Sequence, residues 1–378
     1  MRYRGLTWDH PRGYNALAAA AGTLRDIAID WDKQPLEGFE AHPIGELCAS
    51  YDLVVLDHPH VGEAVEAACL RPLEDLFSLK EVEALGRETI GPSLASYRYA
   101  GRHWALPLDA ATQVTAYRAD LVDGPAPATW EEVIALAARR PVALSLAGPH
   151  AALTFQSIAA ALAEPGAEHD PERFVSAEIG VTVLDIMARL AAATPAAVRD
   201  LNPIGLLGAM AAGDKVALCP LVYGYVNYAA PGDPAAHPIA FANAPRARPG
   251  RRPGSTLGGT GIGISTRAEV TPALLDHLRW LMGAEAQQGF IPDHEGQPSR
   301  RSAWADARVN ARWGDFYRNT ADTIEHAYVR PRHAGAIAFQ TQTSALIRDA
   351  LAGGQSPHAA LGALQNIYTR SRPAGAER

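Results

Sequence analysis

Short apolar runs alternate with amphipathic segments along the first hundred residues. Residues 3–8 and 51–56 are apolar runs of the kind that form buried strands, and residues 27–31 alternate between apolar and polar with a period of two. The segments 15–25 and 44–50 between them are typical of helices. This strand–helix alternation predicts an α/β fold with crossover connections.

The rest of the chain continues the alternation. Strands are predicted at 112–117, 215–222 and 257–265, and helices at 130–138, 150–162, 180–193, 272–283, 335–351 and 359–368. The helix at 130 is preceded by Thr129 and has Glu132 at its third position, which together form a capping box. The helix at 272–283 carries one apolar face, made by Leu274, Leu275, Leu278, Leu281 and Met282.

Composition narrows the class of protein. The chain has 378 residues, of which 48% are apolar and 20% charged, and this is typical of a folded domain rather than a disordered one. The net charge of −7 argues against a nucleic-acid partner, which would need a basic face. The sequence lacks any apolar run of 18 residues, so we expect no transmembrane segment.

The three cysteines, Cys48, Cys69 and Cys219, are too few and too scattered for a disulfide framework or a zinc cluster. Each has apolar neighbours, which predicts buried free thiols.

The first residues run directly into a strand, without an apolar leader or a small-residue cleavage site. As the chain stands, this predicts a cytoplasmic protein. A leader removed beforehand would instead predict a periplasmic or extracellular one.

Several local motifs follow one another in a characteristic order. They are YDLVVLDHP from Tyr51, LRPLEDL from Leu70, YAGRHWALPLD from Tyr99, TAYRADL from Thr115, PATWEEV from Pro127, GDKVAL from Gly213, LGGTGIGIS from Leu257 and GQPSRRS from Gly296. In this order and spacing, and over nearly its whole length, the chain resembles the extracellular solute-binding proteins of ABC importers, the group that includes maltose-binding protein.

The resemblance implies a two-lobed periplasmic-binding-protein fold of type II. Strands cross between two α/β lobes, and a ligand lies in the cleft that closes by hinge motion. Lobe one would comprise 1–110 and 238–301, and lobe two would comprise 111–237 and 302–378.

The loop after the first strand is the most unusual polar cluster in the sequence. Trp8 would pack on a ligand, Asp9 and His10 would hydrogen-bond to it, and Arg12 would pair with an anionic group. The alternative is a capped structural loop that contains an Asp–Arg pair.

The third strand ends in a second polar loop, which we expect beside the first. Asp57, His58 and His60 are candidates for ligand contact, and an extended chain would place the two histidines on one side. A structural polar loop is the alternative. Two histidines beside an aspartate could begin a metal site, but no third strong ligand follows at a local spacing, so no metal site is predicted.

Other candidates lie at the expected crossovers. Asp109 and Gln113 flank the first crossover and could contact ligand or hydrogen-bond across the hinge. Tyr223 and Tyr225 follow a buried strand where the family carries aromatic ligand contacts, although core aromatics are the alternative. His150 and Gln156, near a helix start, are weaker candidates.

The glycines from 258 to 263 superficially resemble a dinucleotide fingerprint. Their spacing is wrong and the segment continues as strand, so it offers no helix N-terminus to a pyrophosphate. We expect instead that Gly259 and Thr260 contact ligand or hinge. Gln297 and Arg300 follow a turn that faces the cleft rim in the family.

These features predict a solute-binding protein for a small polar molecule, with an anion as one candidate, and no cofactor. An ABC permease would be a partner only if the protein is exported. The alternative is a cytosolic enzyme or sensor on the same fold, with Asp9, His10, Asp57 and His58 as acid–base groups. The sequence contains none of the hydrolase, metalloprotease or nucleotide-binding motifs that would require an enzyme.

Overall fold

The computed structural model describes residues 1–163 and 172–372, and this part of the chain is built on one seven-stranded sheet. The sheet order is β2-β1-β3-β9-β6-β7, and β8 pairs with β6. The strands are β1 (Arg2–Trp8), β2 (Ala28–Gln34), β3 (Leu53–Leu56), β6 (Leu106–Tyr117), β7 (Leu218–Tyr223), β8 (Ala240–Ala242) and β9 (Leu257–Ile264). A small separate hairpin joins β4 (Arg98–Tyr99) to β5 (Arg102–His103).

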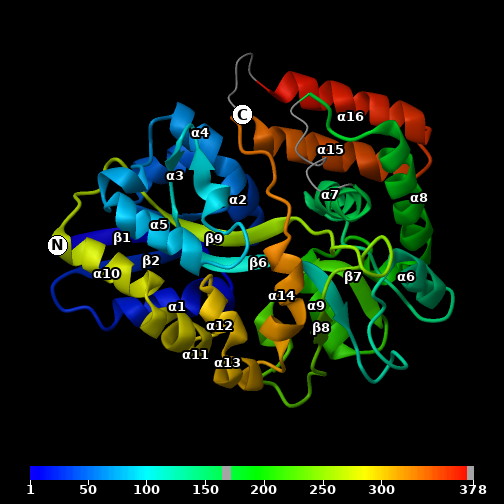
Figure 1. Ribbon diagram of the computed structural model, residues 1–378, viewed down its shortest axis with the longest axis horizontal. Coiled ribbons are helices and arrows are strands. Elements are labelled where there is room, and N and C mark those ends of the chain that lie inside the picture. Colours follow the sequence, from blue (N-terminus) through cyan, green and yellow to red (C-terminus); the bar gives the residue numbers. More distant parts are fainter. Residues whose placement is uncertain (164–171, 373–378) are drawn as a thin grey trace.

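Helices cover this sheet in two groups that lie side by side in Figure 1. The lobe-one group is α1 (Pro11–Ala21), α2 (Leu36–Ala41), α3 (Ile44–Ser50), α4 (Val61–Glu66), α5 (Leu79–Glu88), α10 (Pro272–Met282) and α11 (Ile291–Asp293). The lobe-two group is α6 (Trp130–Ala137), α7 (His150–Leu162), α8 (Ala177–Ala193), α9 (Pro203–Ala212), α15 (Ala336–Leu351) and α16 (Pro357–Ser371). Three further helices, α12 (Arg301–Ala305), α13 (Ala307–Arg312) and α14 (Phe316–Glu325), pack on a lobe-two core.

Strands β6 and β9 connect the lobes. The first half of β6 pairs antiparallel with β9, and its second half pairs with β7 and β8. Ile262 of β9 belongs to a core with Leu53, whereas Val114 of β6 belongs to another with Val222. The predicted α/β, two-lobed architecture is therefore confirmed, with separate cores on either side of the crossing strands.

The strand pairing also bears on the lobe boundaries. β8 lies beside residues 115–117 of β6, in lobe two, whereas β9 pairs with β3 of lobe one. The lobe boundaries predicted near residues 110 and 301 remain a proposal. The third predicted boundary, near residue 238, is where the chain returns from lobe two to lobe one, and we propose that this return instead takes place in β9.

Two local predictions are confirmed by the elements they concern. The Thr129 hydroxyl accepts a hydrogen bond from the Glu132 N–H, and the Glu132 carboxylate accepts one from the Thr129 N–H, so α6 begins with the expected capping box. In α10, most of the predicted apolar face is buried, including Leu274, Leu278 and Leu281.

Gly259 provides a test of the crossing strands. It lies opposite Ala110 with φ +87°, and a Cβ there would lie 2.4 Å from the carbonyl oxygen of Asp109. We expect Gly259→Ala to lower the free energy of unfolding in urea by about 2–4 kcal/mol, through both backbone strain and overlap. Gly101 has a similar φ of +78° but open space around it, so Gly101→Ala should cost only about 1 kcal/mol. Equal losses would contradict the close approach of the two strands.

Candidate functional site

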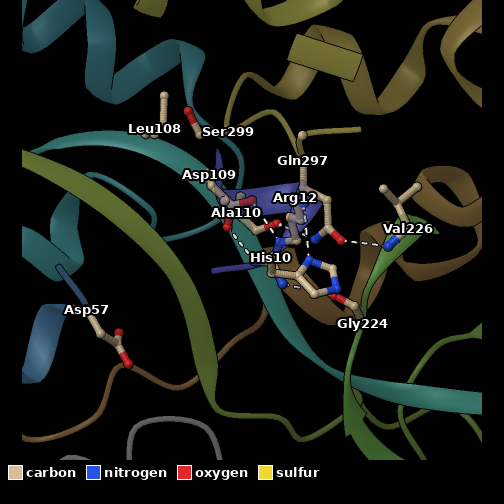
Figure 2. A network of polar contacts seen from close by, with 12 residues as sticks. His10, Arg12, Asp57, Leu108, Asp109, Ala110, Gly224, Val226, Gln297 and Ser299 are labelled. Carbon is tan, nitrogen blue, oxygen red and sulfur yellow. Dashed lines mark hydrogen bonds and ion pairs between the residues drawn. The ribbon is translucent and has the colours of Figure 1, made fainter. Parts of the chain in front are cut away.

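The loop after β1 directs Arg12 into the interior between the lobes. Pro11 starts α1, and the Nδ1 atom of His10 accepts a hydrogen bond from the Arg12 N–H at 3.1 Å, which caps the helix. The Arg12 Nε donates to Asp109 Oδ2 at 2.8 Å and Nη2 donates to Oδ1, while Nη1 donates to the carbonyl of Gly224 at 3.1 Å. Figure 2 shows this network, which joins α1 of lobe one to the end of β7.

Aromatic rings surround the Arg12 guanidinium. Its carbon lies 4.9 Å from the centre of the Tyr225 ring and 5.8 Å from that of Trp8. The His10 ring meets Tyr225 edge-on at 4.7 Å. Ring faces of this kind are suited to packing against the apolar faces of small polar ligands.

Gln297 joins the same network. Its Oε1 accepts a hydrogen bond from the Val226 N–H at 2.8 Å, and its Nε2 donates to the Ala110 carbonyl at 3.1 Å. The buried amide therefore links the crossing strand β6 to the segment after β7 (Figure 2).

The second predicted loop has a different shape from the one expected. His58–His60 form one turn of 3-10 helix, because the Asp57 carboxylate accepts a hydrogen bond from the His58 N–H at 2.8 Å and caps the turn. The chain is therefore not extended here, and the condition under which His58 and His60 would share one side is not met. Both imidazoles are nevertheless buried, and Figure 2 shows Asp57 set apart from the Arg12 network.

Asp57 is paired with an arginine that was not predicted. Arg330, from the segment between α14 and α15, donates through Nη2 to Asp57 Oδ2 at 2.5 Å. Its Nε also donates to the Leu257 carbonyl at 3.1 Å, and its Nη1 donates to Gln340 Oε1 at 3.1 Å. Burial alone would raise the pKa of Asp57, but the charge of Arg330 outweighs it and holds this pKa well below its ordinary value.

A further contact spans the two lobes. Glu40 lies in the last turn of α2 in lobe one, and its Oε1 lies 3.4 Å from Nε2 of His150, the first residue of α7 in lobe two. The His150 ring meets Tyr223 edge-on at 5.9 Å, and the Tyr223 hydroxyl lies 3.2 Å from Thr256 Oγ1. His150, one of the weaker candidates for the binding site, thus contacts Tyr223 through the edge of its ring. Glu40 belongs to the same set of contacts, and the sequence analysis did not identify it.

Several buried polar atoms of the predicted site residues have hydrogen-bonding capacity left. Among the described residues, Trp8 Nε1, His60 Nδ1 and Thr260 Oγ1 have no hydrogen-bond partner. The rings of His58 and His150 approach Asp57 and Glu40, but without hydrogen-bond alignment. Buried polar groups are normally satisfied, so these atoms are suited to bind hydroxyl groups.

The remaining predicted residues have other surroundings. The Gln113 Oε1 accepts from Ser157 Oγ at 2.6 Å and from Thr256 Oγ1 at 3.3 Å, so this side chain is joined to Tyr223 through Thr256. Asp9 is exposed and forms an ion pair with Lys33 at 2.6 Å. Arg300 pairs with Glu88 at 2.6 Å, beside a groove between α5 and α10. The need for glycine at position 259 is explained by the close approach of β6.

The clustered histidines and carboxylates do not amount to a metal centre. Within residues 1–163 and 172–372, no group of three or more His, Cys, Asp or Glu side chains is placed so that it could hold a metal ion. The helices of the same residues are also too short or too polar to cross a membrane.

Burial of the histidines predicts a loss of stability in mild acid. Burial lowers the pKa of His58 from 6.5 to about 4, with Arg330 adding to the effect, and burial lowers that of His10 to about 4 as well. Between pH 6.5 and 4 the unfolded chain binds protons that the folded chain does not, so the free energy of unfolding falls as the pH falls.

Each such histidine contributes a slope of up to about 1.4 kcal/mol per pH unit. Urea unfolding measured from pH 4 to 7 should show this slope, and His58→Gln should reduce it. A slope that His58→Gln leaves unchanged would contradict the assignment.

Solved structures with the same architecture are known. An ABC-transporter solute-binding protein from Agrobacterium radiobacter K84, in complex with ribitol, has a TM-score of 0.78 at 22% identity, covering 98% of each chain. Maltose-bound MalE3 of T. maritima has a TM-score of 0.80 at 18% identity, covering 98% of this chain and 99% of that one. A solute-binding protein from Agrobacterium vitis S4 with bound D-mannitol has a TM-score of 0.74 at 17% identity, covering 98% and 97%.

At these identities the structural similarity establishes the fold. The family follows from a separate sequence comparison, in which the model described as "Bacterial extracellular solute-binding protein" matches residues 45–315, well over half of the chain. The motifs from Tyr51 to Gly296 that carry the predicted resemblance lie within this range. The chain therefore belongs to the bacterial extracellular solute-binding protein family.

Proposed function

We propose that this protein binds a small, uncharged polyhydroxy molecule, a sugar alcohol or a sugar, between its lobes and delivers it to an ABC importer. The observation that carries the proposal concerns the side chains at the proposed site. They present aromatic rings, and the charged groups among them are already paired with each other. Trp8 and Tyr225 provide the rings, and Thr260 and His60 provide free hydrogen-bonding atoms.

The pairing of charges argues for a neutral ligand. Arg12 is neutralised by Asp109, and Arg330 by Asp57, both within the protein. A ligand anion would have to compete with a buried carboxylate for either guanidinium, and that exchange would leave a carboxylate unpaired. A neutral polyol needs only hydrogen bonds. We therefore no longer favour an anionic ligand.

The comparisons support this class of ligand. The similar structures are described with ribitol, D-mannitol and maltose, all of them neutral polyhydroxy compounds. The family description supports a binding role outside the cell, and nothing in these comparisons favours the alternative of an enzyme. Contacts from both lobes to one ligand would stabilise the closed arrangement.

Calorimetric titration with ribitol, D-mannitol and maltose tests the proposal, with citrate and glucose 6-phosphate as anionic comparisons. We expect at least one neutral compound to bind at least about tenfold more tightly than either anion, a difference of about 1.4 kcal/mol. Tighter binding of an anion would contradict the proposal.

Tyr225→Ala is expected to weaken binding of the preferred neutral compound by at least about tenfold, because a ring face at the proposed site is lost. Tyr14→Ala is the matched control, since the Tyr14 ring instead contacts Lys33 of β2. The same titration measures both variants. Equal affinities for the two variants would place the ligand away from Tyr225.

A further inference from the structure

Helix α2 of lobe one touches lobe two at two points. Asn202, the N-cap residue of α9, donates through Nδ2 to Glu37 Oε1 at 3.4 Å. Almost one turn further along α2, Glu40 Oε1 lies 3.4 Å from Nε2 of His150 at the start of α7. Residues three positions apart lie on the same face of a helix, so α2 presents both carboxylates to lobe two. Figure 1 shows α2 on the side of lobe one that faces the lobe-two helices.

The attachment of α2 to its own lobe is slight. The helix is six residues long, of these Phe39 is buried, and no described side chain caps the first turn. The Phe39 ring packs against Trp8, with 5.2 Å between the ring centres. A helix of this length is not stable by itself, and a segment with few buried apolar contacts opens at a low free energy. We therefore expect α2 to detach while the core of lobe one stays folded.

Two polar side chains of the proposed site are buried next to α2. Trp8, which packs against Phe39, is 3% exposed. His150, opposite Glu40, is 2% exposed. Within residues 1–163 and 172–372, Trp8 Nε1 and both ring nitrogens of His150 have no hydrogen-bond partner. Buried polar atoms are normally satisfied, so these atoms are suited to hydrogen-bond a ligand that is bound next to α2.

We propose that α2 is a lid over the binding site, which Glu37 and Glu40 hold shut against lobe two. Its movement is separate from the hinge motion between the lobes. With α2 in place, the polar atoms of Trp8 and His150 are closed off from solvent, and with α2 detached a ligand reaches or leaves them. The role of the lid as a gate rests on the proposed function, whereas its contact with lobe two does not.

A substitution in lobe two tests the lid without changing it. Asn202 Oδ1 accepts a hydrogen bond from the Gly205 N–H at 2.9 Å and so caps α9. Asn202→Asp keeps this capping oxygen, because aspartate caps helices as well as asparagine does. It also replaces the Nδ2 donor with a charged oxygen beside Glu37, and like charges repel. Asn202→Asp should therefore loosen α2 of lobe one while α9 stays capped.

Two further variants accompany Asn202→Asp. Glu40→Ala removes the contact with His150 from the side of the lid. Asn319→Asp is the matched control for charge, because Asn319 is exposed on α14, which lies apart from α2 in Figure 1. It adds the same carboxylate away from the lid and should leave α2 unchanged.

Hydrogen exchange of the whole protein, followed by mass spectrometry, measures the opening of α2. The reporting amides are those of Phe39 and His42, which donate to backbone carbonyls in the preceding turn at 3.0 and 2.9 Å. We expect Asn202→Asp and Glu40→Ala to speed their exchange by about threefold to fivefold, the effect of losing one weak polar contact. Exchange in β1, and exchange of α2 in the control, should stay as in the wild type.

The exchange is measured without ligand and with a neutral compound that calorimetry finds to bind. Stopped-flow tryptophan fluorescence then measures the release of that compound, which should be about threefold to fivefold faster in both lid variants. Exchange of α2 that neither variant changes in either condition, faster exchange that includes β1, or unchanged release would each overturn the proposal. Absence of binding by every neutral compound would instead contradict the proposed function, and the exchange without ligand would still decide whether Glu37 and Glu40 hold α2 in place.

Discussion

Asp109→Asn is expected to lower the free energy of unfolding by about 3–5 kcal/mol, because it leaves the Arg12 guanidinium buried without its counter-charge. The Arg12 side chain is 4% exposed and that of Asp109 is 5% exposed, so water cannot replace the lost carboxylate. Asparagine has nearly the same shape as aspartate, and the loss therefore reports the charge rather than a packing defect. Urea unfolding at neutral pH measures it.

Two variants serve as controls for Asp109→Asn. Asp30 pairs with Arg2 at 2.6 Å on the surface, where both side chains are more than half exposed, so Asp30→Asn should cost less than about 1 kcal/mol. The double variant Arg12→Met with Asp109→Leu removes both charges, and it should recover part of the stability that Asp109→Asn loses. A small loss for Asp109→Asn, similar to that of Asp30→Asn, would contradict the role of the buried pair.

Arg330→Met is expected to lower the free energy of unfolding by about 2–4 kcal/mol. The guanidinium is buried and donates to Asp57, the Leu257 carbonyl and Gln340, all of which would lose a donor. Arg301→Met is the matched control, because Arg301 pairs with Glu325 at 2.6 Å while it is 47% exposed. The control should cost less than about 1 kcal/mol.

The same variant should become more sensitive to acid. In the wild type the pKa of Asp57 lies below its ordinary value of 3.8, so the stability it contributes is present above about pH 4 and is lost as the pH falls further. Without Arg330, burial raises this pKa, and the acid-unfolding midpoint should move to higher pH. An unchanged midpoint for Arg330→Met would contradict the assignment of Arg330 as the charge that holds Asp57 ionised.

Much of the fold could be predicted because its signals are local. The capping box at Thr129 and the apolar face of α10 each lie within a few residues, and both predictions are confirmed. The full length of β6 was not predicted. Pro107 lies inside this strand, next to a shift in register with β9, and a proline within an apolar run argues against a strand at that point.

The candidate site was predictable only in part. The loops at Trp8–Arg12 and Asp57–His60 follow strand ends, which meet at one edge of a sheet. Their partners have no such signal: Arg12 and Asp109 are 97 residues apart, and Asp57 and Arg330 are 273 apart. Only the folded chain shows that these charges neutralise each other, and this narrows the proposed small polar ligand, for which an anion was one candidate, to a neutral molecule.

The histidine side chains offer the most direct test of a neutral ligand bound between the lobes. In ¹⁵N-histidine-labelled protein, the imidazole signals can be assigned with His→Gln variants and followed while ribitol, D-mannitol or maltose is added. We predict that at least one of these compounds shifts the signals of His10, His60 and His150, and leaves those of His277 on α10 and His326 after α14 unchanged. Shifts confined to His277 or His326, or a response of the interlobe histidines to citrate and to none of the neutral compounds, would contradict the proposed binding site.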